Sequence, residues 1–78
     1  MITSDQIRAA RALLNWSRAE LSECSGVGIS ALMRLESAEG IPGGHTKTMQ
    51  AVISTFESAG IEFVGTPEEG AGVRWSIK

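Results

Sequence analysis

The stretch from Ser17 to Gly26 constrains the fold of this chain more than any other part of the sequence. Ser17-Arg18-Ala19-Glu20 fits the capping box S/T-x-x-E, in which a serine begins a helix and a glutamate three residues later bonds back to the serine amide. Gly26 can adopt the left-handed backbone conformation that ends a helix. The sequence therefore predicts a short second helix whose two ends are both defined.

A helix is predicted on each side of this segment. The first begins after a cap at Thr3 or Ser4, and the third begins at Gly28 or Ser30 and runs to about Ser37. Apolar residues recur with helical spacing in both and are expected to face the core. They are Ile7, Ala10, Leu13 and Leu14 in the first helix and Ala31, Leu32 and Leu35 in the third.

The second half of the chain changes its period. Glycines and a proline predict a loop at residues 39–44, and a fourth helix runs from near Thr46 to Gly60. Its apolar stripe consists of Met49, Val52, Ile53 and Phe56. Beyond it, residues 61–64 and 73–78 alternate apolar and polar side chains, which predicts two strands of a hairpin. The expected fold is mainly α: a four-helix domain over residues 1–60 and a C-terminal β-hairpin over 61–78.

Length and composition limit what holds this fold together. Cys24 is the only cysteine among 78 residues, so an internal disulfide is excluded. Cys24 and His45 are the only soft metal ligands and lie far apart in sequence, so neither a metal nor another cofactor is predicted. No segment has the length of a signal peptide or a membrane span, and a lone cysteine suits a reducing compartment, so we expect a cytoplasmic protein.

The second and third helices, joined at Gly26, form the pattern of a helix-turn-helix, with Leu21, Val27 and Leu32 fixing the angle between them. The segments 14–21, 25–27 and 32–36 together resemble the lambda-repressor-like (Xre-type) family of regulators, and the resemblance extends over residues 4 to about 60. It implies a sequence-specific duplex-DNA-binding regulator whose third helix enters the major groove.

The resemblance also implies which residues contact DNA. Arg18 replaces the glutamine with which the family contacts phosphate, and Gly28 replaces its usual serine or threonine cap. Ser30 and Arg34 can hydrogen-bond base edges, whereas apolar neighbours in the same helix can pack against thymine methyl groups. The full predicted set is Ser17, Arg18, Gly28, Ile29, Ser30, Met33, Arg34, Ser37 and Lys47. By the same resemblance, Arg11 and Glu36 form an internal ion pair.

The hairpin is expected to build a homodimer. Its apolar side chains, Ile61, Phe63, Val73, Trp75 and Ile77, exceed what four short helices can cover, and its last strand has an open edge. The alternative is a monomer whose hairpin folds back on the first and fourth helices.

Charge supports a competing interpretation of function. Seven Lys and Arg against nine Asp and Glu give a net charge of −2, whereas nucleic-acid-binding proteins usually carry a basic surface. A protein-interaction module, an antitoxin-like or regulatory partner that keeps the fold, fits this balance and the apolar Ile29 and Met33. No enzyme is predicted, because the chain has no nucleophile–base pair and no phosphate-cradling glycine loop.

Overall fold

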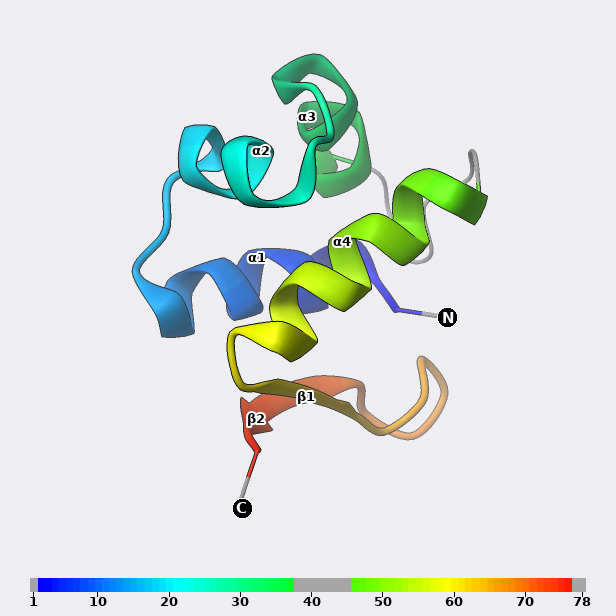
Figure 1. Ribbon diagram of the computed structural model, residues 1–78. Helices are drawn as coiled ribbons and strands as arrows, with labels where there is room; N and C mark the ends of the chain where they lie inside the picture. The colour runs from blue at the N-terminus through cyan, green and yellow to red at the C-terminus, as the bar shows by residue number, and fades with distance from the viewer. Residues whose placement is uncertain (1, 38–45, 77–78) are drawn as a thin grey trace.

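The computed structural model describes residues 2–37 and 46–76, which form four helices and a two-stranded sheet. In chain order the elements are α1 (Ser4–Leu14), α2 (Arg18–Ser25), α3 (Ile29–Ser37), α4 (Thr46–Ser58), β1 (Ile61–Val64) and β2 (Gly72–Trp75) (Figure 1). The expectation of a mainly helical chain with a C-terminal antiparallel hairpin is confirmed. The predicted loop at 39–44, together with His45 and Ile77, lies outside the described residues.

Local capping signals define the start of α1 and both ends of α2. Of the two candidate caps of α1, Thr3 is the one used: its side chain accepts from the Gln6 amide at 3.1 Å, and the Gln6 side chain bonds back to the Thr3 amide. The same reciprocal box joins Ser17 and Glu20 at the start of α2, as predicted. Gly26 ends α2 with a φ of 74°, in the left-handed region that glycine adopts without strain.

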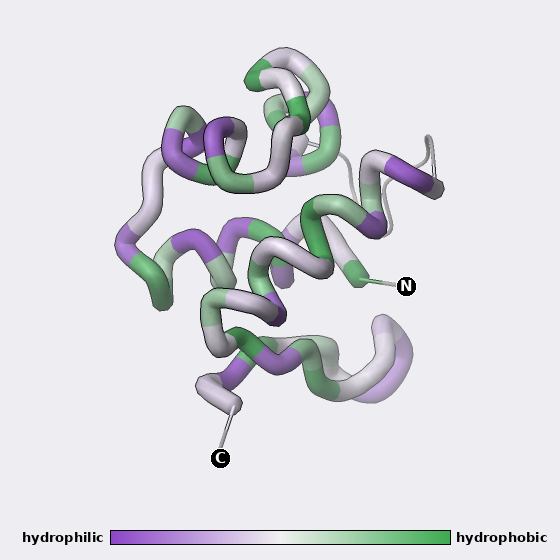
Figure 2. The backbone as a smooth tube through the Cα atoms, in the orientation of Figure 1, coloured by the Kyte–Doolittle hydropathy of each residue, from purple (hydrophilic) through white to green (hydrophobic). Residues whose placement is uncertain are grey.

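The helices share one apolar core. Its buried members include Ile7, Ala10, Leu21, Val27, Leu32, Leu35, Met49, Val52, Phe56 and Ile61, and Ile53 and Ala31 pack partly buried against them. Hydrophobic and hydrophilic stretches alternate along every helix (Figure 2), as expected of elements with only one buried face.

One predicted core position is wrong. Leu13 is 39 % exposed, although Ile7 and Ala10 on the same helix are fully buried. At 3.6 residues per turn, Leu13 lies about 120° around the helix axis from Ile7, which turns it away from the stripe that Leu14 continues. The apolar face of α1 is therefore narrower than the sequence indicated.

The hairpin lies against the helices, with β1 next to α4 and β2 next to α1 (Figure 1). Ile61 pairs with Trp75 and Phe63 with Val73. The second strand is shorter than predicted: it begins at Gly72 and ends at Trp75.

Gln6 fastens the hairpin to α1. Its side-chain nitrogen donates to the Gly72 carbonyl at 2.9 Å and to the Val64 carbonyl at 3.4 Å. The residue is only 3 % exposed, and its side-chain oxygen accepts from the Thr3 amide at 2.8 Å. A single buried side-chain amide thus provides hydrogen-bond partners for the Thr3 amide at the start of α1 and for one carbonyl of each strand.

An exposed ion pair bridges the two strands. Arg74 donates to both carboxylate oxygens of Glu62, at 3.1 and 2.9 Å. This hydrogen bond lowers the pKa of Glu62 below its usual value and raises that of Arg74.

Candidate nucleic-acid interface

The connection between α2 and α3 is short and held by hydrogen bonds. Ser22 donates its hydroxyl to the Val27 carbonyl at 2.6 Å, and the hydroxyl of Ser25 accepts from the Val27 amide at 3.2 Å. Val27 itself is buried, and the Gly28 carbonyl accepts the first bond of α3, from Leu32 at 3.1 Å. The side chains around this turn therefore fix how α3 is presented relative to α2.

Helix α3 has a buried and an exposed face. Leu32, Leu35 and Glu36 point inward and are 0, 7 and 2 % exposed. On the other side, Ile29 and Met33 are 46 and 48 % exposed. The predicted groove-facing residues thus lie on the side of α3 away from the core.

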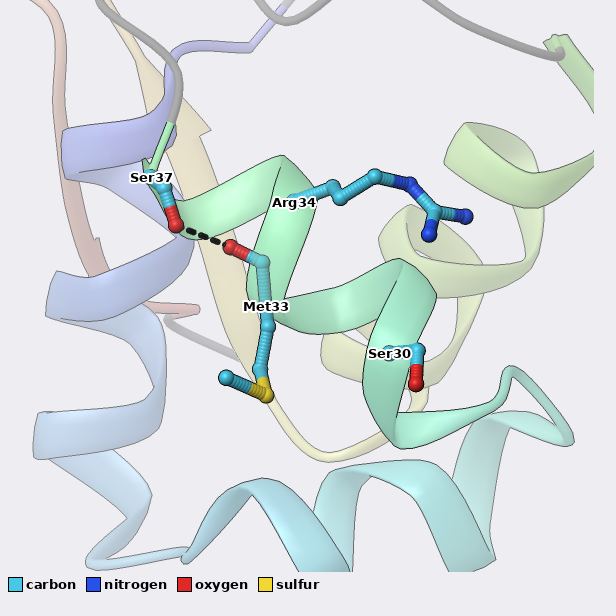
Figure 3. A pocket seen from close by; sticks show the side chains of 4 residues that line it. All are labelled: Ser30, Met33, Arg34 and Ser37. Atoms are coloured by element: carbon cyan, nitrogen blue, oxygen red, sulfur yellow. Dashed lines mark hydrogen bonds between the residues drawn. The ribbon is translucent and has the colours of Figure 1, made fainter.

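An open hollow of about 530 Å³ lies along this exposed face (Figure 3). It is lined by Ser30, Met33, Arg34 and Ser37, all of which the sequence placed in the DNA-contacting set. Met33 and Arg34 extend from α3 in different directions, so that an apolar and a cationic side chain flank the hollow (Figure 3). Arg34 forms no ion pair with any residue in the described ranges.

Three other predicted contacts lie at helix ends. Lys47 is exposed in the first turn of α4. Ser17 is exposed too, but its hydroxyl is occupied as the α2 cap. Gly28 is exposed, and a Cβ added there would meet nothing within 4 Å, so this position is open to an approaching molecule.

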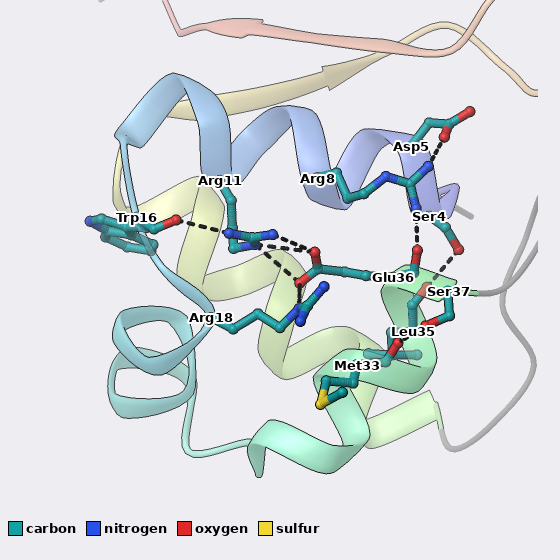
Figure 4. A network of polar contacts seen from close by, with 10 residues as sticks. All are labelled: Ser4, Asp5, Arg8, Arg11, Trp16, Arg18, Met33, Leu35, Glu36 and Ser37. Atoms are coloured by element: carbon teal, nitrogen blue, oxygen red, sulfur yellow. Dashed lines mark hydrogen bonds and ion pairs between the residues drawn. The ribbon is translucent and has the colours of Figure 1, made fainter.

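The structure brings Arg11 and Glu36 together. The Nε of Arg11 donates to both carboxylate oxygens at 3.2 and 3.1 Å, and its Nη2 donates to Oε1 at 2.6 Å (Figure 4). Its remaining nitrogen donates to the Trp16 carbonyl at 3.0 Å. The Glu36 side chain is 1 % exposed and that of Arg11 is 20 % exposed. The pair ties α3 to the end of α1 and to the segment leading into α2.

Two further arginines join this network, and the sequence analysis predicted neither of these contacts. Arg8 donates to the backbone carbonyl of Glu36 and also pairs with Asp5 (Figure 4). Arg18, expected as a surface phosphate contact, lies with its Nε 3.4 Å from a Glu36 oxygen, and its side chain is 40 % exposed. That Nε is buried, and the geometry does not make a hydrogen bond, so Arg18 interacts with Glu36 through charge alone. These residues are distant in sequence from Glu36, and no local pattern reveals the cluster.

The candidate dimer residues divide between the core and the surface. Ile61 is 2 % exposed in its own chain, so it has no surface left for a second copy. Phe63 packs edge-on against Phe56 with ring centroids 6.0 Å apart, and Val73 packs partly buried against the core. Trp75, by contrast, is 49 % exposed. Of the described members of the set, Trp75 retains the most surface.

Other kinds of site are sparse in the described residues. Within 2–37 and 46–76, no cluster of three or more His, Cys, Asp or Glu could hold a metal ion. None of the helices in those ranges has both the length and the apolar character needed to cross a membrane. A second hollow of about 370 Å³ lies beside Trp16 and Cys24, and small side chains from the end of α4 and from Ala59 just after it line the rest.

Comparison with known proteins adds no assignment. No protein-family model matches the sequence, and no curated protein matches it significantly.

Proposed function

We propose that this chain binds duplex DNA through a helix-turn-helix of the lambda-repressor-like type, made of α2, the turn at 26–28 and α3. The observation that carries the proposal is the two-sided character of α3. One face is pinned by Leu32, Leu35 and the Arg11–Glu36 pair, and the opposite face is open over the hollow at Ser30. A major groove about 12 Å wide admits one helix presented in this way.

The charge of that face supports DNA over other ligands of a shallow surface. Glu36 is the only acidic residue of α3, and it is buried and paired with Arg11. The exposed face of α3 therefore carries Arg34 as its only charge, although the chain as a whole has a net charge of −2. Arg34 and Ser30 would read base edges, and Ile29 and Met33 would pack against thymine methyl groups. Arg18 and Lys47 would contact phosphates.

The test is selection of bound sequences from random duplexes, followed by fluorescence anisotropy with Arg34→Ala. We expect this variant to lose roughly 1–3 kcal/mol of preference at one base position. Arg74→Ala is the matched control, because it removes the same charge from the hairpin. Equal losses of duplex affinity in both variants, with base preference unchanged, would mean that only net charge matters. The proposal is overturned if no duplex binds at about 50 mM salt with an affinity that falls as the salt concentration is raised.

A second candidate function is a protein-interaction module that uses the same face of α3. It is favoured by the net charge of −2 and by Ile29 and Met33, each nearly half exposed. This candidate takes precedence if duplex binding fails while Met33→Ser abolishes capture of a defined protein partner.

The same proposal includes a homodimer formed through the hairpin, now with Trp75 as its main anchor. A two-fold contact there would set two copies of α3 about 34 Å apart, the spacing of half-sites one DNA turn apart. Sedimentation of the full chain and of Trp75→Ala tests this. A full chain that is monomeric at tens of micromolar contradicts the dimer.

A further inference from the structure

Two arginines share one buried carboxylate at the junction of α1, α2 and α3 (Figure 4). Arg11 donates three hydrogen bonds to the Glu36 oxygens, between 2.6 and 3.2 Å. Arg18 adds a second positive charge at 3.4 Å but donates no hydrogen bond to it. The carboxylate is neutralised by Arg11 alone, so the cluster has one cation in excess.

We infer that Arg18 is an exchangeable counter-ion, which rests against Glu36 in the free protein and moves to an external phosphate oxygen when one is offered. Arg11 stays on Glu36 throughout. The inference deepens the proposed function and rests on it for the natural source of that phosphate, the DNA backbone.

The resting position of Arg18 is poorly satisfied. Its Nε–H is buried without an acceptor, and such a donor loses its hydration with nothing in exchange. Nε is the only Arg18 nitrogen that is buried without a partner, and the side chain is 40 % exposed, so water can reach the rest of the guanidinium. It also lies close to a second guanidinium, that of Arg11, which repels it. Leaving this position would therefore cost Arg18 only the attraction of a carboxylate that already has a better partner.

The destination is close to the resting position. Arg18 is the first residue of α2, at the end of the helix where the backbone dipole favours an anion, although the capping box already uses the Glu20 amide there. Its side chain is 40 % exposed, so the guanidinium has an open path to solvent. A phosphate oxygen at this end would give the guanidinium the directed, charge-assisted hydrogen bonds that Glu36 does not provide.

The exchange has a consequence for α3. If Arg18 were a fixed part of the ion pair, phosphate binding would loosen Glu36 and with it the angle of α3. With Arg11 holding Glu36 independently, α3 keeps its position whether or not a phosphate is bound. Contact with the DNA backbone is then separated from the positioning of the helix that reads the bases.

The test follows the guanidinium Nε–Hε signals of the full-length, isotope-labelled protein by NMR. Arg18→Gln, Arg11→Gln and Arg74→Gln identify the three signals by their loss. Inorganic phosphate is titrated against chloride at constant ionic strength and slightly acidic pH. We expect a large saturable shift of the Arg18 signal, a smaller shift of the Arg11 signal because both guanidinium groups share the Glu36 carboxylate, and no shift of the Arg74 signal. The inference is overturned if Arg18 shifts no more than Arg74, or if Arg11 shifts as much as Arg18.

Thermal unfolding gives a second readout that does not involve phosphate. Arg18→Gln should lower Tm by less than about 4 °C, and Arg11→Gln by clearly more, because each kcal/mol corresponds to about 4–8 °C in a domain of this size. Equal losses would make Arg18 a structural partner and overturn the exchange.

A labelled duplex then separates this inference from the proposed function. If phosphate shifts Arg18 but no duplex binds, the exchange stands and DNA binding fails. If a duplex binds without shifting Arg18, DNA binding stands and the exchange fails.

Discussion

The Arg11–Glu36 pair provides the sharpest test of how α3 is held. Substitution of Arg11 by Met leaves a carboxylate that is 1 % exposed, with Arg18 at 3.4 Å and no side-chain hydrogen bond from it. Removing one partner of a buried pair costs about 3–5 kcal/mol. A chain of 78 residues has a free energy of unfolding of roughly 4–12 kcal/mol, at about 0.05–0.15 kcal/mol per residue. Arg11→Met should therefore remove a large part of the stability.

The reverse substitution should cost less. With Glu36→Leu, the Arg11 side chain is 20 % exposed and keeps its bond to the Trp16 carbonyl, so water can reach part of the guanidinium. We expect a loss of about 1–3 kcal/mol. The double variant should be more stable than Arg11→Met alone, because it buries no unpaired charge.

Urea unfolding followed by circular dichroism measures all three variants, with Arg74→Met as a control for removing an exposed arginine. The reasoning is refuted if the coupling energy between the two substitutions is below about 0.5 kcal/mol. It is also refuted if Arg11→Met costs no more than Arg74→Met.

Three further outcomes can be measured, one each by urea unfolding, thermal unfolding and NMR titration. Leu32→Ala should cost about 2–5 kcal/mol in urea unfolding, because Leu32 is fully buried between α3 and the core. Gly65→Ala should lower Tm more than Gly70→Ala: both glycines have positive φ, of 77° and 93°, but only at Gly65 would a Cβ overlap the backbone, at the Gly70 carbonyl. The hydrogen bond from Arg74 lowers the pKa of Glu62 below its usual 4.5, so the stabilisation from this pair is present above pH 4.5 and is lost as the pH falls through the lowered pKa. A carbon NMR titration of the Glu62 carboxyl should return the usual value in Arg74→Gln, and an unchanged titration in that variant would contradict the assigned cause.

Local signals in this sequence predicted the helix ends and the apolar stripe of α4, whereas the long-range polar contacts could not be predicted. The Ser17–Glu20 box and the stop at Gly26 depend on neighbouring residues, and both are present in the structure. The stripe of α4 followed from its period, with Ile53 only partly buried. The prediction that Leu13 faces the core was wrong, because an apolar residue near a stripe does not show how wide the buried face of the helix is.

The candidate site was predictable to the extent that helix periodicity decides exposure. Ser30, Met33 and Arg34 occupy the outward positions expected of them. The pairing of Arg18 with Glu36 could not be predicted, because it depends on where α2 crosses α3 and not on the spacing of the two residues. The exposure of Trp75 likewise depends on how far α1 and α4 cover the hairpin.

The amide of Gln6 links the start of α1 to the hairpin. The same side chain bonds to the Thr3 amide and to the carbonyls of Val64 and Gly72, so fraying of the first turn of α1 would break its hydrogen bonds to both strands. In native-state hydrogen exchange, segments that open together share one opening free energy. The first turn of α1 and the two strands should therefore exchange as one unit, although some 60 residues separate them in sequence. Such a link between distant segments also raises the contact order of a helical chain, and folding is expected to be slower than for four helices that meet only their sequence neighbours.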